Sequence, residues 1–370
     1  MKTSLIELIR HAAGVGASDI HVGLNQNPKI RIHSHLLDAE GFAVVTPERM
    51  EAYLREVTPE PKLERFFKEK EMDYSFVVEG VGSCRSNLFF QRGNPGMAIR
   101  ILPSRIWTFE ELGLDAEMMR RMADRPTGLV LVTGATGSGK TTTLASLVEY
   151  VNTTRPCHII TVEDPVEFVF EGKKAKIDQR EVGLDTHSFT GALKYILRQD
   201  PDVVLIGEMR DLETIETALN VAETGHLVFA TLHTSDTIQT INRVIDVFPE
   251  HKQRQVRTQL SFVLNAVLSQ RLVPSSCGTG RALCAEIMIV NSAIRSMIRD
   301  EKVHQIYSFL QTSKESGMKT MNQSLADLVL AKKVDLEEAV HFSNDPDEMI
   351  RLVEEAAPAE KKKGFMGRRS

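Results

Sequence analysis

Two kinds of hydrophobic periodicity mark the first hundred residues of the chain. Apolar residues recur every three to four positions at 4–13 and 47–67, which predicts two helical segments. Apolar and polar residues alternate in five shorter stretches, which predicts strands at 19–22, 28–33, 74–78, 85–90 and 97–102. This order of helix, strands, helix and antiparallel meander predicts an α+β domain over residues 1–103, in which helices cover one sheet.

From about residue 110 onward, short apolar stretches alternate with helical patterns. The predicted strands are 128–133, 158–162, 202–206 and 226–231. The clearest predicted helices are 142–151, 188–199 and 212–223. Apolar strands that alternate with helices are typical of a parallel sheet covered on both faces, so the predicted fold class is α/β. After about residue 250 the strand signal weakens, and helical patterns dominate through Val353.

These changes of pattern divide the chain into four predicted parts. The α+β domain ends at residue 103, a linker covers 104–112, and an α/β domain with a helical C-terminal part covers 113–355. Residues 356–370 are rich in Pro, Ala, Gly and charge, which predicts a disordered basic tail. Such a tail is either a solvated chain end or a weak contact to an acidic membrane or protein surface.

A glycine-rich loop lies between the predicted strand at 128–133 and the helix at 142–151. Residues 134–141 fit the pattern G-x-x-x-x-G-K-[ST] without a gap. The glycines let backbone N–H groups turn toward phosphate oxygens, and the helix N-terminus adds positive potential. Lys140 is expected to reach the β and γ phosphates, and Thr141 to hold Mg²⁺. The residues predicted to contact the nucleotide are Gly134, Ala135, Thr136, Gly137, Ser138, Gly139, Lys140, Thr141 and Thr142.

An acidic residue follows the predicted strand at 202–206. A P-loop needs an acid at the end of a neighbouring strand to organise the metal, and Glu208 stands at such a position. Gly207 before it permits a close approach of the backbone. Glu208 is therefore predicted to order Mg²⁺ beside Thr141, directly or through water.

Three more acids, Glu163, Asp164 and Glu167, stand after the strand at 158–162. As a group they predict a cluster that activates water near the γ-phosphate. Their spacing does not identify which of them is the base.

Two histidines, His226 and His233, bracket the predicted strand at 226–231. No second acid or thiol stands at zinc-ligand spacing, so polar contacts near the nucleotide are expected of them. Such a histidine either donates to phosphate or links one active site to the next as the nucleotide is hydrolysed.

Composition and charge narrow the class of protein. The length of 370 residues predicts two or three domains, and 42% hydrophobic content is enough for a sizeable core in each. The formal net charge of -5 gives no global positive field, so no nucleic acid is expected as a partner. The four cysteines form no C-x-x-C pair, which predicts neither a disulfide framework nor a zinc ribbon. The N-terminal helix carries Glu7 and Arg10, and no apolar run reaches the ~18 residues of a membrane span, so a cytoplasmic protein is expected.

The motifs together resemble those of the type IV pilus retraction ATPase family (PilT), within the RecA-like secretion ATPases. In family order they are the Walker A loop 134–141, an Asp box at 163–167, the Walker B segment 207–211 and a His box at 226–233. Residues 293–300, Ala-Ile-Arg-Ser-Met-Ile-Arg-Asp, are similar to the family's retraction-associated motif AIRNLIRE. They depart from it at Ser296, Met297 and Asp300. The resemblance covers nearly the whole chain.

The resemblance implies a fold, an assembly and residue roles. The fold is a RecA-like P-loop ATPase domain with an N-terminal PAS-like α+β domain, and the assembly is a homohexamer. Glu167 is implied as the acid that activates water and Glu208 as the organiser of Mg²⁺. The predicted catalytic set is Glu167, Glu208, Lys140, Glu163, Asp164 and His233, and the predicted nucleotide contacts also include His226 and Arg210. Candidates for arginines that act across subunits are Arg85, Arg100, Arg198, Arg210 and Arg243.

The function that the resemblance implies is a motor that hydrolyses ATP with Mg²⁺ and drives type IV pilus retraction, and hence twitching motility. It would work in the cytoplasm, peripheral to the inner membrane at the pilus base, on an inner-membrane platform protein. A paralogous retraction ATPase is a further expected partner.

Three alternatives stay open, of which a nucleic-acid translocase is the least favoured, because the sequence predicts no basic surface interleaved with aromatic residues. Pilus assembly and type II secretion ATPases usually carry an extra N-terminal domain and often a tetracysteine zinc site, neither of which this sequence shows. An accessory subunit that modulates another retraction motor is the second alternative. The intact Lys140, Glu167 and Glu208 favour activity but are also compatible with that accessory role.

Overall fold

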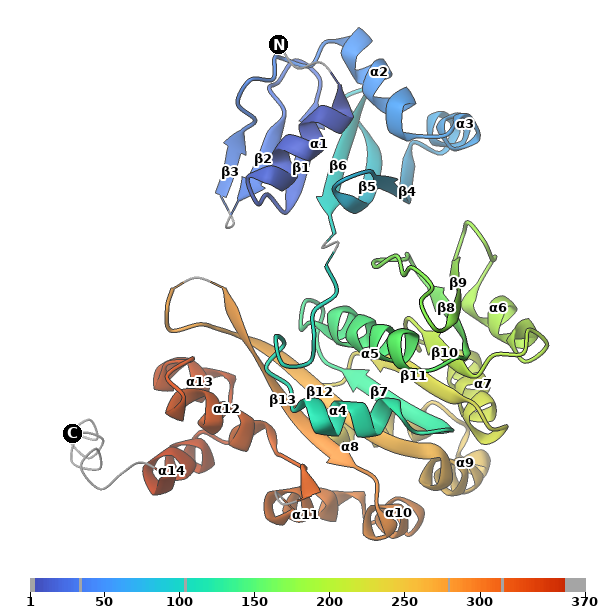
Figure 1. Cartoon of the computed structure of the whole chain (residues 1–370), viewed down its shortest axis with the longest axis vertical. Helices are drawn as coiled ribbons and strands as arrows, with labels where there is room; N and C mark the ends of the chain where they lie inside the picture. The colour runs from blue at the N-terminus through green and yellow to red at the C-terminus, as the bar shows by residue number, and fades with distance from the viewer. Residues whose placement is uncertain (1–3, 33–34, 103–104, 279, 314–315, 357–370) are drawn as a thin grey trace. The chain divides into compact units, whose positions relative to one another are not determined.

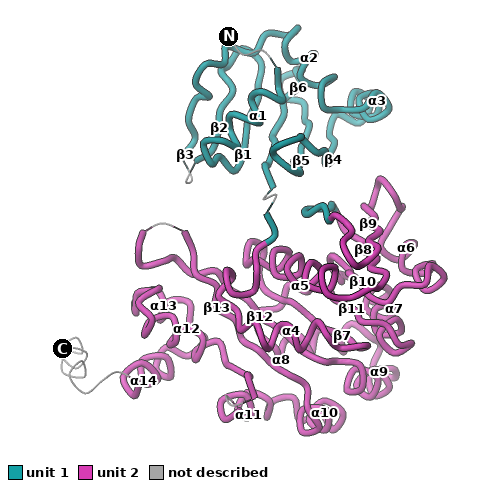
Figure 2. Tube along the Cα trace, viewed as in Figure 1, with its two compact units in different colours: residues 1–106, 165–170 teal, residues 107–164, 171–370 magenta. Residues whose placement is uncertain are grey.

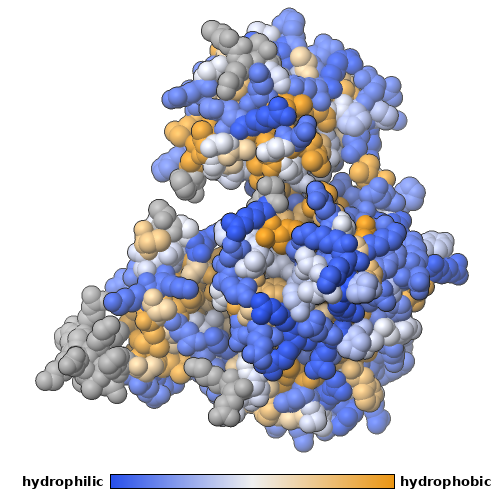
Figure 3. Space-filling model, viewed as in Figure 1, coloured by the Kyte–Doolittle hydropathy of each residue, from blue (hydrophilic) through white to orange (hydrophobic). Residues whose placement is uncertain are grey.

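The computed structural model describes residues 4–32, 35–102, 105–278, 280–313 and 316–356 (Figure 1). The chain divides into two units, residues 1–106 with 165–170 and residues 107–164 with 171–370 (Figure 2). The tail expected at 356–370 lies, except for Ala356, outside the described residues. None of the described helices is both long and apolar enough to cross a membrane. The face drawn in Figure 3 is mostly polar, with scattered apolar side chains.

The first unit is an antiparallel sheet with three helices. The helices are α1 (Leu5–Gly14), α2 (Pro47–Val57) and α3 (Glu60–Glu69). The strands are β1 (Asp19–Gly23), β2 (Lys29–Ile32), β3 (His35–Asp38), β4 (Glu71–Val78), β5 (Gly82–Gln91) and β6 (Asn94–Ile101). They lie in the order β3-β2-β1-β6-β5-β4, and the helices pack their apolar faces on the sheet around Leu8, Ile20, Leu54 and Leu88. This arrangement is the α+β fold that the sequence predicts.

The segment at 47–67, predicted as one helical stretch, is broken in two. Thr58 ends α2 in an extended conformation, with φ −113° and ψ 118°. Pro59 follows it, and proline disfavours helical backbone for the residue before it. Helix α3 then begins directly after Pro59.

The second unit is built around a seven-stranded sheet. Its strands are β7 (Gly128–Thr133), β8 (His158–Glu163), β9 (Lys176–Glu181), β10 (Val203–Ile206), β11 (Leu227–Leu232), β12 (Leu264–Pro274) and β13 (Arg281–Ile289). They lie in the order β13-β12-β7-β11-β10-β8-β9, parallel throughout except for the antiparallel pair β12 and β13. Strands β7, β10 and β11 are buried at every residue, as expected when helices cover both faces.

The helices of the second unit are α4 (Ala116–Ala123), α5 (Lys140–Thr154), α6 (Phe189–Ile196), α7 (Leu212–Glu223), α8 (Thr237–Asp246), α9 (Glu250–Val263), α10 (Ser292–Arg299), α11 (Ile306–Thr312), α12 (Met321–Leu330), α13 (Leu336–Phe342) and α14 (Pro346–Ala356), with a 3₁₀ turn at Val303–Gln305. Helices α12 to α14 share a separate small core with β12 and β13. This group is called the C-terminal helices below.

The prediction that helical patterns dominate after residue 250 is wrong for β12 and β13. Polar residues interrupt the apolar pattern of β12, yet Ser269 and Gln270 are completely buried. Their side chains bond to Thr133 and Thr143 of the adjoining strand and helix. A strand that buries polar residues on both faces of the sheet shows neither the continuous apolar run nor the alternation by which strands are found.

Four parallel strands end at one edge of this sheet. The strand register pairs Leu232 with Thr133, and Ile206 with both Val162 and Ala230. The segments that follow β7, β8, β10 and β11 therefore emerge side by side, as ligand-binding segments do in open α/β sheets.

Candidate nucleotide-binding and catalytic site

The glycine-rich loop joins β7 to α5 with a backbone that only glycine adopts at its first position. Gly134 has a φ of +143°, and Gly137 and Gly139 also have positive φ. A Cβ on Gly134 would lie 2.4 Å from the carbonyl oxygen of Gln270 and 2.5 Å from Ser138 Oγ. Strand β12 thus supports the loop from behind, and no side chain fits between them.

Lys140 begins helix α5 and turns back into the loop. Its Nζ donates to the carbonyl oxygens of Gly134, at 2.8 Å, and Ala135, at 3.1 Å. Ser138 Oγ is buried and has no hydrogen-bond partner among the described residues. An ammonium group, an orphaned hydroxyl and a helix N-terminus form a donor set that suits a phosphate group.

Glu208 lies just beyond β10, at the same sheet edge as the loop. One carboxylate oxygen accepts from Arg210 Nη2 at 2.7 Å, and the other lies 2.9 Å from His233 Nε2. Burial raises the pKa of Glu208, but the Arg210 hydrogen bond and the charges of His233, Arg210 and Lys140 outweigh it and lower the pKa below its usual value. Glu208 is therefore an ionised acid at neutral pH. The structure brings together Lys140, Glu208, Arg210 and His233.

Gly207 packs against the end of β8, where two of the predicted acids lie. A Cβ there would be 3.2 Å from the Val162 carbonyl oxygen, so glycine brings the two strand ends close. Glu163 is buried, and its carboxylate accepts from Thr161 Oγ1 at 2.6 Å and Gln179 Nε2 at 3.3 Å. Asp164 is exposed. The pKa of Arg210 is raised mainly by Glu208, and the charge of Asp164 adds to this effect.

Glu167 lies in the segment 165–170, which groups with the first unit. Its assignment as the acid that activates water stays a prediction.

His226 lies at the other edge of the sheet from His233. Its carbonyl oxygen accepts from Gly128 N at 2.9 Å, at the start of β7, and its Nδ1 contacts Val221 O and Thr224 Oγ1. Six strand residues separate the two histidines, which is about 20 Å. His226 is therefore not part of the loop cluster of its own chain, and its expected contact with a nucleotide stays a prediction.

The arginine candidates occupy different surroundings. Arg210 pairs with Glu208, and Arg243 Nη2 lies 3.5 Å from the carbonyl oxygen of Arg210. Arg198 lies over the Tyr195 ring. Arg100 pairs with Asp19 in the first unit, opposite Arg85 on the next strand. Which of them acts across subunits stays a prediction.

Several residues that support the loop were not singled out from the sequence. Ser269 Oγ bonds to Thr133 Oγ1 at 2.8 Å, and Gln270 Nε2 donates to Thr143 Oγ1 at 2.8 Å. Arg281 Nη1, at the start of β13, lies 3.5 Å from the Gly137 carbonyl oxygen at the loop tip. Polar residues inside a strand were the only signal in the sequence that could have pointed to Ser269 and Gln270.

The residues at this edge fit a magnesium nucleotide. Within the described residues, no three or more His, Cys, Asp or Glu side chains are grouped so that they could hold a metal ion. Mg²⁺ that arrives with a nucleotide needs no such cage, because phosphates and waters supply most of its ligands. The Thr141 hydroxyl and the Glu208 carboxylate are oxygen donors of the kind that Mg²⁺ prefers.

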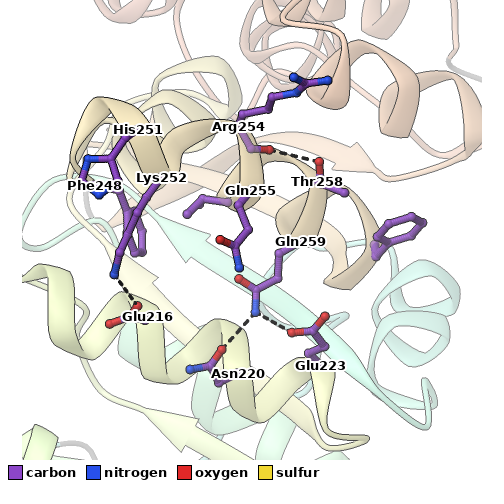
Figure 4. A pocket seen from close by; sticks show the side chains of 12 residues that line it. Glu216, Asn220, Glu223, Phe248, His251, Lys252, Arg254, Gln255, Thr258 and Gln259 are labelled. Carbon is purple, nitrogen blue, oxygen red and sulfur yellow. Dashed lines mark hydrogen bonds and ion pairs between the residues drawn. The ribbon is translucent and has the colours of Figure 1, made fainter.

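A groove of about 640 Å³ lies between α7 and α9 (Figure 4). Gln259 crosses it and donates to Asn220 and Glu223 near the end of α7, while Lys252 reaches Glu216. It contains none of the residues predicted for the nucleotide site.

The geometry defines the class of protein. The buried strand β7 leads through the glycine-rich loop into helix α5. Glu208 follows β10, which is separated from β7 in the sheet by β11. These features together define a RecA-like P-loop ATPase core. Residues 2–351 match the model of the Type II/IV secretion system protein family, and the chain belongs to that family.

The most informative relatives are pilus motors. The type IV pilus retraction ATPase PilT of Pseudomonas aeruginosa is 44% identical over 343 residues, which cover 93% of this chain and 99% of PilT. The type IV pilus ATPase PilU of the same organism is 35% identical over 353 residues, 95% of this chain and 92% of PilU. A crystal structure of the pilus retraction motor PilT with bound ADP is 46% identical and superposes with a TM-score of 0.88, covering 95% of this chain and 100% of that one. The resemblance stated from the motifs is thus confirmed.

Proposed function

We propose that this protein is an ATP-hydrolysing motor that powers type IV pilus retraction. One observation carries the proposal: Lys140 of the glycine-rich loop lies near enough to Glu208 for its charge to lower the pKa of Glu208, in a chain that aligns with PilT over nearly the full length of both. The alignment supports the biological role, and the loop and the acid support the chemistry.

The reaction is attack of water on the γ-phosphorus of ATP, with release of ADP and phosphate. Lys140 Nζ would exchange its bonds to loop carbonyls for bonds to β and γ phosphate oxygens. Thr141 and Glu208 would hold Mg²⁺, which when bound neutralises phosphate charge. Glu167 is the residue assigned to accept the proton of the attacking water, with Glu163 and Asp164 beside it in sequence.

His233 and Arg210 complete this assignment. Both contact Glu208 and so fix the orientation of its carboxylate. A ring of six copies would place the nucleotide at a subunit seam, where an arginine of a neighbour could neutralise charge in the transition state. We therefore propose a homohexamer that acts on the pilus platform protein at the inner membrane, together with a paralogous ATPase.

An accessory role is the second candidate function. PilU, whose name says only that it is a type IV pilus ATPase, aligns with 95% of this chain, so length does not restrict the proposal to the retraction motor. The higher identity to PilT, 44% against 35%, favours the retraction motor itself.

Purified full-length protein tests the proposal. We expect hydrolysis of ATP that requires Mg²⁺, does not respond to DNA, and falls at least about 100-fold in Lys140→Ala. Light scattering on the same sample reports whether six copies assemble. A folded Lys140→Ala variant that keeps wild-type turnover would contradict the site assignment, and stimulation by DNA would favour a nucleic-acid translocase.

A further inference from the structure

A single buried carboxylate, that of Glu286 on β13, accepts hydrogen bonds from the first residues of two helices. Glu286 is 2% exposed. Its Oε1 accepts from the backbone N of Thr237 at 2.9 Å and from Thr237 Oγ1 at 2.7 Å. Its Oε2 accepts from the backbone N of Met321 at 3.4 Å. Thr237 begins α8 and Met321 begins α12, so one side chain holds the N-termini of both.

Helix α8 starts directly after the loop that presents His233 to Glu208. Only residues 234–236 separate His233 from Thr237. Within this turn Thr234 Oγ1 and Thr240 Oγ1 are 2.6 Å apart, and Thr240 Oγ1 also contacts Thr133 Oγ1, at the end of β7, at 3.4 Å. A shift of the α8 N-terminus therefore has two expected effects. It moves the preceding turn, which carries His233, and it disturbs the contact of Thr240 with Thr133 at the end of β7.

Helix α12 is the element by which the C-terminal helices dock on β13. Besides the Glu286 contact, Ile287 exchanges two backbone bonds with Lys319, and Ala285 N donates to Ser324 Oγ at 3.1 Å. Met321 and Leu325 then join the core that α12 to α14 share. Helix α12 thus helps to set the position of the group, together with Arg271 of β12, which donates to Asn344 Oδ1 at 2.8 Å.

An anion at a helix N-terminus is stabilised by the free N–H groups and the helix dipole. Glu286 lies at two helix N-termini, and its three donors offset part of the cost of burying its charge. Because the carboxylate is rigid, the Thr237 and Met321 amides keep a fixed separation while both bonds persist. A displacement of one helix start must move the other or break a bond.

We propose that Glu286 is a positioning residue that couples the nucleotide site to the C-terminal helices, by holding the start of α8 and the start of α12 with one carboxylate. The inference rests on the proposed nucleotide-binding function and extends it. Contacts at the nucleotide that pull Glu208 and His233 are passed through α8 to Glu286, and from there to α12.

Glu286→Gln tests this coupling because the amide keeps only one acceptor oxygen. That oxygen can serve the two donors of Thr237, which leaves an NH₂ group facing the Met321 amide. Ser324→Ala is the matched control, since it removes a different bond between β13 and α12 and leaves Glu286 intact. Hydrogen–deuterium exchange with and without Mg-ADP then reports on three peptides, at 134–142, 233–241 and 319–326.

In the wild type and in Ser324→Ala we expect Mg-ADP to slow exchange in all three peptides. In Glu286→Gln we expect the response at 134–142 and 233–241 to persist and that at 319–326 to be lost. A persistent response at 319–326 in Glu286→Gln, its loss in Ser324→Ala, or its absence in the wild type would overturn the inference. No response at 134–142 in the wild type would instead contradict the proposed function.

Steady-state ATPase kinetics provide a second readout, with kcat calculated per folded protein so that a general loss of stability does not imitate the effect. We expect Glu286→Gln to lower kcat about tenfold with KM for Mg-ATP changed less than about twofold, while Ser324→Ala keeps kcat within about twofold. If Glu286→Gln does not fold, Thr237→Val removes one of the two bonds that Glu286 accepts at the α8 end and should reduce the exchange response at 319–326. An unchanged response in folded Thr237→Val together with wild-type kcat would also overturn the inference.

Discussion

The closest approach in the nucleotide site, between Gly134 and strand β12, gives a sharp test of the loop geometry. Gly134→Ala adds one methyl group at a φ of +143°, a conformation open only to glycine. The methyl carbon would lie 2.4 Å from the carbonyl oxygen of Gln270, which is backbone and cannot rotate away. Either the loop or β12 must move.

The magnitude has two parts. Forcing a non-glycine residue into such backbone costs about 1–3 kcal/mol. Relieving the clash is an overpacking problem of about 1–3 kcal/mol. The two costs together destabilise the fold by about 4 kcal/mol. A domain of this size loses about 2–4 °C of Tm per kcal/mol, so the Tm should fall by about 8–16 °C.

Gly137→Ala is the matched control in the same loop. Its φ is +79°, and nothing lies within 4 Å of the added carbon, so only the left-handed backbone penalty of about 1 kcal/mol applies. We expect a Tm loss of about 2–4 °C by differential scanning fluorimetry without nucleotide. Equal Tm losses in the two variants would refute the close contact between the loop and β12.

Four further predictions concern the site and its connections. Lys140→Ala should keep Tm near the wild-type value, because the residue serves a ligand, while affinity for fluorescent ADP falls at least about tenfold. Glu167→Gln should lower kcat and leave nucleotide binding unchanged, since a base acts in the transition state; loss of binding would move the role to Glu163. Replacing Arg295 and Arg299 together with alanine should spare ATPase activity and abolish retraction in cells, and normal retraction would contradict this. Burial raises the pKa of Glu286, with Thr237 bonds opposing it, so stability is lost as pH rises from the ordinary pKa of about 4.5 toward the higher folded-state pKa. The Tm of the wild type minus that of Glu286→Gln should therefore decrease as pH rises above about 4.5, and a constant difference would count against this.

The parts of the site that the sequence predicts are those encoded in contiguous motifs. The loop at 134–141 and Glu208 follow apolar strands that are buried at every position, so their secondary-structure context is readable from periodicity. The helix at 212–223 was predicted with the bounds that the structure has, because its N-cap Asp211 and its apolar spacing agree.

The parts that were missed depend on contacts between distant residues. The buried polar residues Ser269 and Gln270 of β12 bond to Thr133 and Thr143, which stand more than a hundred residues earlier in the chain. The partners of Glu286 lie 49 and 35 residues away, and nothing local distinguishes its carboxylate from a solvated one. The sequence predicts that His226 and His233 both lie near the nucleotide. The six-residue strand β11 between them places the two histidines at opposite ends of the strand, and so on opposite sides of the sheet along the strand direction.

The most direct test of the central claim is a count of surface pili after deletion of the gene in its own host. The account predicts excess pili that no longer retract, restored to normal number by the wild-type gene but not by Lys140→Ala. Bald cells would contradict it and favour the assembly alternative, and normal retraction would favour an accessory role.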